Sequence, residues 1–121
     1  MANEIQVTTK LYSAKGGATT ANATHNWTAN MAGTDMITLT QQIGTTEESL
    51  SVGPDVGAPY AVEIANTDGT NYIEFGFAAG VYVGRIPAGQ SLLIPYVAAS
   101  VTIYVKANTA AVQIITTATE L

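Results

Sequence analysis

Residues 60–77 read YAVEIANTDGTNYIEFGF and contain two short apolar stretches on either side of an Asp-Gly pair. Successive side chains of a β-strand point to opposite faces, so one face of the second stretch takes Ile73, Phe75 and Phe77. Hairpin turns prefer Asp-Gly, because glycine tolerates the positive φ angles that these turns need. The segment therefore predicts two strands joined by a turn, Tyr60–Asn66 and Tyr72–Phe77.

The same pattern continues to the end of the sequence. Separators that contain glycine, at residues 78–80 and 87–90, divide it into short stretches rich in β-branched and aromatic residues. These stretches predict four further strands, Val81–Ile86, Ser91–Tyr96, Val101–Ala107 and Val112–Glu120. The core candidates are apolar side chains that share a strand face, namely Ile73, Phe75, Phe77, Val101, Ile103, Val105, Val112 and Ile114.

The upstream half also has the two-residue period of strands. Apolar and polar residues alternate over Ile5–Leu11, and Thr20–Met31 alternates Thr or Asn with other residues. Met36–Ile43 predicts another strand, and Leu50–Val52 a brief pairing. Two prolines and two glycines in residues 53–59 forbid a regular ladder, so this segment is expected to be a surface loop.

Strands that recur about every ten residues, with no longer stretch of helical period, predict an all-β fold. We expect an antiparallel β-sandwich, jelly-roll-like, with eight or nine short strands. The length of 121 residues is typical of one domain, so a single β-sandwich domain is expected over residues 1–121.

The most regular stretch carries a row of uncharged polar residues. Because they lie two positions apart, one strand face is expected to hold Thr20, Asn22, Thr24, Asn26, Thr28 and Asn30. The simplest interpretation is a sheet with its polar side in water. The functional interpretation is a flat, uncharged face that packs against another chain, and these six residues are our first interface candidates.

Residues 92–94 form an apolar run, Leu-Leu-Ile, that places apolar side chains on both faces of one predicted strand. Such a strand lies between packed layers or carries one face to a partner, because a lone domain seldom exposes a large apolar patch. Leu93 is therefore a further interface candidate.

The composition excludes several kinds of partner. Charged residues make up 11% of the chain and hydrophobic residues 47%, with a formal net charge of −5. Four basic residues provide no stripe for a phosphate backbone, so nucleic-acid binding is not expected. No apolar run reaches the length of about 18 residues that a membrane span needs, and we expect no membrane association. Without cysteine, thiol chemistry is excluded.

No set of residues indicates catalysis. His25 is the only histidine, and it has no partner at the spacing of a metal site or a nucleophile motif. The residues around Asp68 lack the alternating acids of a calcium loop. We therefore expect a protein that is not an enzyme, with no cofactor and no metal. Six tyrosines leave open a sugar-binding platform, although packing at the edge of the core explains them equally well.

Several segments resemble small virion proteins of tailed bacteriophages. They are residues 65–76 (ANTDGTNYIEFG), 86–90 (IPAGQ) and 104–110 (YVKANTA), with the opening MANEI and residues 43–46 (IGTT) in support. The resemblance implies a β-sandwich auxiliary protein of the particle, similar to decoration or cement proteins that bridge major capsid subunits. It implies a virion location, the major capsid protein or another virion protein as partner, and a homo-oligomer, but it transfers no site residues.

Two other functions stay open at this point. The chain could serve in the same particle as a tail, fibre or head-tail connector component, which copy number would separate from a decoration protein. From a different class, it could be a carbohydrate-binding module that uses its tyrosines and Trp27, since aromatic rings serve as binding anchors.

Overall fold

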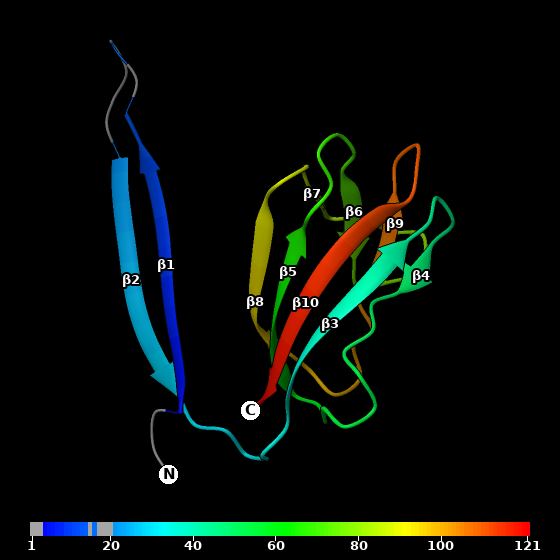
Figure 1. The fold of residues 1–121 in the computed structure, drawn as a ribbon. Helices are drawn as coiled ribbons and strands as arrows, with labels where there is room; N and C mark the ends of the chain where they lie inside the picture. Colours follow the sequence, from blue (N-terminus) through cyan, green and yellow to red (C-terminus); the bar gives the residue numbers. More distant parts are fainter. Residues whose placement is uncertain (1–3, 15, 17–20) are drawn as a thin grey trace. The chain divides into compact units, whose positions relative to one another are not determined.

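A computed structural model describes residues 4–14, 16 and 21–121. The contacts divide the chain into two compact units, Met1–Ala32 and Gly33–Leu121. The described residues form ten strands and no helix (Figure 1), namely β1 (Ile5–Ser13), β2 (Ala21–Ala29), β3 (Met36–Ile43), β4 (Glu48–Ser49), β5 (Tyr60–Asn66), β6 (Ile73–Gly76), β7 (Gly84–Ile86), β8 (Ser91–Val97), β9 (Tyr104–Ala107) and β10 (Val112–Glu120).

The first unit is a two-stranded antiparallel ribbon, which we call the ribbon. Strands β1 and β2 pair without a register shift from Ile5 opposite Ala29 to Ser13 opposite Ala21. The alternation in both strands places residues of like polarity opposite each other, which fixes this register, because a slip of one residue would exchange the two faces.

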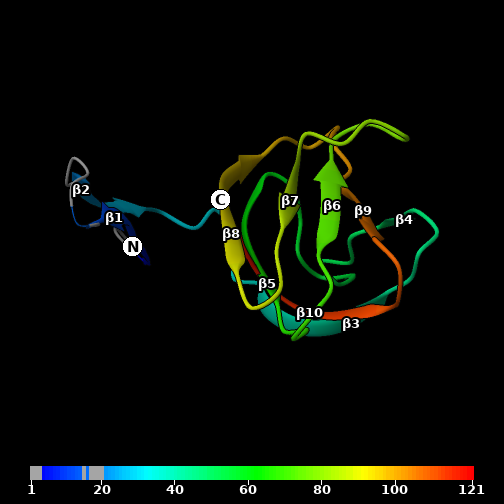
Figure 2. The ribbon, with the colours of Figure 1, turned by 90° about the horizontal axis from the view of Figure 1, so that it is seen from above.

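The second unit consists of two four-stranded sheets, in the orders β3-β10-β5-β8 and β4-β9-β6-β7 (Figures 1 and 2). Its antiparallel pairs are nested: β6 pairs with β7, β5 with β8, β4 with β9, and β3 with β10. The chain thus runs out through four strands and returns along them, like one long hairpin centred on the β6–β7 connection.

Two additional pairings roll this long hairpin into a sandwich. Strand β10 also pairs with β5, and β9 also pairs with β6, so each sheet takes two strands from the outward half and two from the returning half. Eight strands in two such sheets are the jelly-roll arrangement. The predicted all-β, jelly-roll-like sandwich is confirmed, and we call residues 33–121 the jelly roll.

The strand count was wrong, since ten strands are present in the described residues rather than eight or nine. Eight belong to the jelly roll, and the first two predicted strands form the ribbon instead. The sandwich therefore accounts for residues 33–121. That the whole of residues 1–121 is one domain stays a prediction.

Side chains of both sheets meet in one apolar core. Its fully buried members come from the predicted strand faces and include Ile43, Ile64, Ile73, Ile103, Val105, Val112 and Ile114. Close packing of these β-branched residues removes their apolar surface from water, which is the main driving force of folding. Most of the predicted core candidates are confirmed.

Phe77 was a core candidate and is 44% exposed instead. Strand β6 ends at Gly76, and the chain then turns through a bridge between Ala78 and Val81, so the alternation no longer places residue 77 inside. A Cβ atom at position 76 would overlap the carbonyl oxygen of Val81, and only glycine permits this approach. The strand predicted over Val81–Ile86 is shorter in the structure: β7 spans Gly84–Ile86, and Val81 forms the bridge with Ala78 instead.

One polar side chain is buried beside this core and organises the predicted turn. The Asn66 amide nitrogen donates hydrogen bonds to the carbonyl oxygens of Asn71 (2.9 Å) and Ile86 (3.0 Å), and its amide oxygen accepts one from the Asp68 N–H (2.9 Å). The Asp68 carboxylate accepts bonds from the Thr70 and Asn71 N–H groups, and these bonds lower its pKa. The side chains of Asn66, which is buried, and of Asp68 therefore both hold the turn in place.

We expect Asn66→Ala to lower the free energy of unfolding by about 2–4 kcal/mol, because it leaves buried carbonyl groups without donors. Urea denaturation followed by circular dichroism measures this change. Gln42→Ala, at an exposed position of β3, is the control and should stay within about 0.5 kcal/mol of wild type. Equal stabilities of the two variants would contradict a structural role of Asn66.

Candidate functional site

The two faces of the ribbon differ in polarity. Register places Asn22, Thr24, Asn26 and Thr28 of β2 opposite Tyr12, Lys10, Thr8 and Gln6 of β1. These eight residues form what we call the polar face. It includes four of the six residues of the predicted Thr/Asn row. Asn30 is exposed beyond the end of β2, and Thr20 lies outside the described residues.

Hydrogen bonds between neighbouring side chains orient the polar face. The Thr8 hydroxyl donates to the amide oxygen of Asn26 across the strands (2.8 Å), and the Thr24 hydroxyl donates to that of Asn22 (3.3 Å). The Lys10 ammonium lies 5.5 Å from the centre of the Tyr12 ring. Thr and Asn side chains both donate and accept hydrogen bonds, so this face suits a polar, uncharged protein surface.

The opposite side of the ribbon is what we call the apolar face. Its cross-strand pairs are Ile5 with Ala29, Val7 with Trp27, Thr9 with His25, and Leu11 with Ala23. It contains no carboxylate, ammonium or guanidinium group. Leu11 is 75% exposed and Trp27 is half-buried. His25, the only histidine of the chain, is exposed here between Ala23 and Trp27 along the strand.

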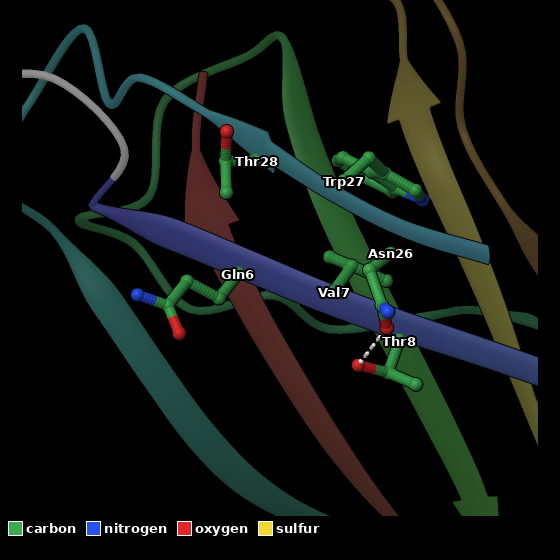
Figure 3. Close-up of a pocket in the computed structure, with 6 residues that line it drawn as sticks. All are labelled: Gln6, Val7, Thr8, Asn26, Trp27 and Thr28. Carbon is green, nitrogen blue, oxygen red and sulfur yellow. Dashed lines mark hydrogen bonds between the residues drawn. The ribbon is translucent and has the colours of Figure 1, made fainter.

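A hollow of about 330 Å³ lies near the Ile5–Ala29 end of the ribbon and is lined by Gln6, Val7, Thr8, Asn26, Trp27 and Thr28 (Figure 3). These are three consecutive residues of each strand, and neighbours on a strand point to opposite faces. They therefore cannot enclose one cavity, and the hollow is a shallow surface of the ribbon. It suits contact with a protein better than capture of a small ligand, which needs a concave pocket.

Leu93, the remaining interface candidate, belongs to the jelly roll and is not part of the ribbon. It lies half-buried on β8 opposite Glu63, on the outer face of the β3-β10-β5-β8 sheet. Thr117 of β10 lies next to Glu63, and the hydroxyl groups of Thr38 and Thr117 are 3.4 Å apart. Leu93 therefore lies on a sheet face with threonine residues, which resembles the composition of the polar face.

The outer face of the other sheet carries both basic residues of the jelly roll. Arg85 of β7 and Lys106 of β9 each lie opposite Glu74 of β6, so one carboxylate is flanked by two cations. The Arg85 guanidinium lies 4.3 Å from the centre of the Tyr72 ring, a cation–π contact. Sequence reasoning missed this group, because alternation gives the face of a residue but not which strands are neighbours.

Glu47 and Tyr82 join the same group at the edge of this sheet. The Tyr82 hydroxyl donates a hydrogen bond to the Glu47 carboxylate (2.5 Å), which also accepts one from the Gly80 N–H (2.7 Å). The hydrogen bond from Tyr82, followed by that from Gly80, lowers the pKa of Glu47. The same bond raises the pKa of Tyr82 to about 12. The contact ties the β6–β7 connection to the segment before β4.

We expect Glu47→Gln to lower the pKa of Tyr82 from about 12 toward its ordinary value of 10.0, because a neutral amide no longer opposes formation of the phenolate. Phenolate absorbance during an alkaline titration of the folded protein measures this shift. The stabilisation that Tyr82 gains from this bond is present below pH 10 and is lost as the pH rises through about 12.

Glu63→Gln is the matched control for this titration. It removes a carboxylate from the other sheet of the jelly roll and should leave the pKa of Tyr82 at about 12. A Tyr82 that keeps its high pKa in Glu47→Gln would show that the hydrogen bond is not its cause.

Two further carboxylates of the jelly roll, those of Asp35 and Glu120, lie beside the start of β3. Glu120 accepts a hydrogen bond from the Asp35 N–H (3.0 Å), and a hydrogen bond between the two carboxyl groups raises the pKa of Asp35. Glu120 fills the space beside Gly33, where a Cβ atom would lie 2.5 Å from it, so its contacts secure the start of β3. Within residues 4–14, 16 and 21–121, no three His, Cys, Asp or Glu side chains gather at a possible metal site.

No family model, curated protein or solved structure matches the chain. In the part of the chain that the structure describes, there is no helix long and apolar enough to cross a bilayer. The surfaces described above are therefore the basis for an assignment of function.

Proposed function

We propose that this chain is a non-enzymatic structural protein of a phage particle that binds the capsid surface as a decoration or cement protein. The ribbon is the observation that carries this proposal. The ribbon is a single layer of two strands, and a two-stranded ribbon gains stability when another surface covers one of its faces. The partner that we propose for its polar face is the major capsid protein.

The chemistry of the polar face fits such a partner. Of its eight residues only Lys10 is charged, so binding removes few charges from water. A hydrogen bond already holds Thr8 and Asn26 in place, which reduces the entropy lost on binding. Repeated, identical contacts on a shell benefit from such a preorganised surface.

The jelly roll fits the role of a rigid body that the ribbon attaches to the particle. Jelly rolls occur in viral capsid and lectin domains, which supports the proposal by analogy of fold. Residues 33–121 hold Arg85 and Lys106 against eight of the nine acidic residues of the chain, a formal charge of −6. An acidic body suits the outside of a shell better than contact with packaged DNA.

Purified protein mixed with shells that lack it should bind at regular positions and reach saturation, and cryo-electron microscopy of the mixed particles checks this. Asn26→Lys should weaken binding by at least about tenfold, because it places a charge in the centre of the polar face. Thr109→Lys, in the exposed β9–β10 connection, is the matched control. Shells that stay bare at saturating protein would overturn the proposal.

The copy number separates this function from its alternative in the same particle. A decoration protein covers the shell in many copies, whereas a tail, fibre or head-tail connector component is present in few. Quantitative mass spectrometry of purified particles gives this number relative to the major capsid protein.

The group around Glu74 favours carbohydrate binding as a second candidate function. Tyr72, just before β6, and Tyr104 of β9 flank Glu74 and Lys106, and rings beside charged groups can hold sugars. Against this function, Arg85 covers the Tyr72 ring and Glu47 binds the Tyr82 hydroxyl. A glycan array with the wild-type protein and Tyr104→Ala tests it, and an array without signal would remove it.

A further inference from the structure

The jelly roll has an apolar groove on its surface. The groove has a volume of about 330 Å³ and is lined by Phe77, Ile94, Tyr96, Val97, Ala98 and Val101. Tyr96 is 61% exposed, and Val81 and Val83 in the connection after Phe77 are also largely exposed. Large apolar side chains gathered on a surface mark a site of protein contact more often than chance.

The groove takes most of its residues from β8 and from the connection that follows it. Strand β8 is at one edge of its sheet, as β7 is of the other, so each has one unpaired side. Pro95 lacks an N–H group and interrupts the free edge of β8, which limits pairing by an added strand. The groove is therefore suited to side-chain contact rather than to a long backbone ladder.

The end of the sheet that bears this groove is acidic. Val97 of β8 lies opposite Tyr60 of β5, and Tyr60 lies opposite Glu120 of β10. The Glu120 N–H donates to the Asp35 carbonyl (3.2 Å), so both carboxylates belong to this end. A partner with an apolar surface and a positive charge would complement it.

The ribbon has these two properties. Its apolar face has no second layer within the ribbon, since two strands form a single layer. Residues 1–32 contain Lys10 and Lys15 against one acid, Glu4, so their formal charge is +1. Lys10 lies on the polar face, so the opposite formal charges act over long range: they oppose contact of jelly roll with jelly roll and favour approach of a ribbon to a jelly roll.

We propose that the apolar face of the ribbon of one copy covers the apolar groove on the jelly roll of a second copy. Leu11, Val7 and Trp27 provide the apolar contacts, and Phe77 and Tyr96 receive them. The polar face stays available on the other side of the ribbon. The proposal is independent of the phage particle and holds for the purified protein.

The area of the contact sets the expected strength. A nine-residue ribbon is roughly 30 Å long and about 10 Å wide, so each of its faces offers about 300 Å². Two copies that exchange their ribbons bury at most about 1,200 Å², the lower limit for a stable interface. We therefore expect association that depends on protein concentration in about the micromolar range.

Trp27 is the only tryptophan and reports directly on this contact. As the concentration of wild-type protein rises, the mass in analytical ultracentrifugation should double and the Trp27 emission should shift to the blue. Tyr96→Asp changes only the groove, at an exposed position that does not endanger the fold. It should stay monomeric with red-shifted emission, although its ribbon is intact. Ser100→Asp, exposed in the connection that follows β8, is the control.

A mixing experiment identifies the two surfaces. Leu11→Asp damages the ribbon at an exposed position and should also be monomeric, with circular dichroism confirming its strands. A mixture of Leu11→Asp and Tyr96→Asp still contains one intact groove and one intact ribbon. It should form mixed pairs, at a higher concentration than wild type because one of two contacts is lost.

Each other outcome overturns the proposal. Association that survives Tyr96→Asp but is lost in Leu11→Asp means that ribbons bind ribbons. Association that survives Leu11→Asp but is lost in Tyr96→Asp means that jelly rolls bind each other. Blue-shifted emission from a monomer at every concentration means that a ribbon covers the groove of its own chain. A wild-type monomer with red-shifted emission means that the apolar face binds no copy of this protein.

Discussion

The double pairing of β10 is the interaction on which the jelly roll depends. This strand pairs with β3 on one side and with β5 on the other, and it joins the start of the jelly roll to its centre. Its buried side chains Val112, Ile114 and Ala118 face the core from the middle of the sheet. Without β10 the remaining strands β5 and β8 would lose their connection to β3, and one side of the core would be open to water.

Much of this fold follows from the sequence, because hydrophobic alternation fixes where a strand lies. The bounds of β3, β5 and β10 coincide with the predicted strands, since turn residues or loss of alternation ends each of them. Alternation fails where the backbone is constrained by a neighbour, as at Gly76, where the close approach of Val81 exposes Phe77.

The candidate site was only partly predictable, for a related reason. Alternation placed Asn22, Thr24, Asn26 and Thr28 on one face, but it gives no information on partner strands. The division between ribbon and jelly roll, with Leu93 in the second unit, depends on contacts distant in sequence. The same holds for Glu74 between Arg85 and Lys106, since these three residues come from strands whose order the nested pairing decides. The apolar groove likewise combines residues 77, 94–98 and 101.

The nested order of the strands has a consequence for synthesis of the protein. Residues near the start of the jelly roll find their partners only on the returning half, with Ile43 opposite Val112 and Glu48 opposite Val105. Such distant contacts close slowly, because the chain entropy of a long loop is lost before the contact forms. A nascent chain therefore cannot complete either sheet until β9 and β10 have left the ribosome, and until then its apolar strands are exposed to water.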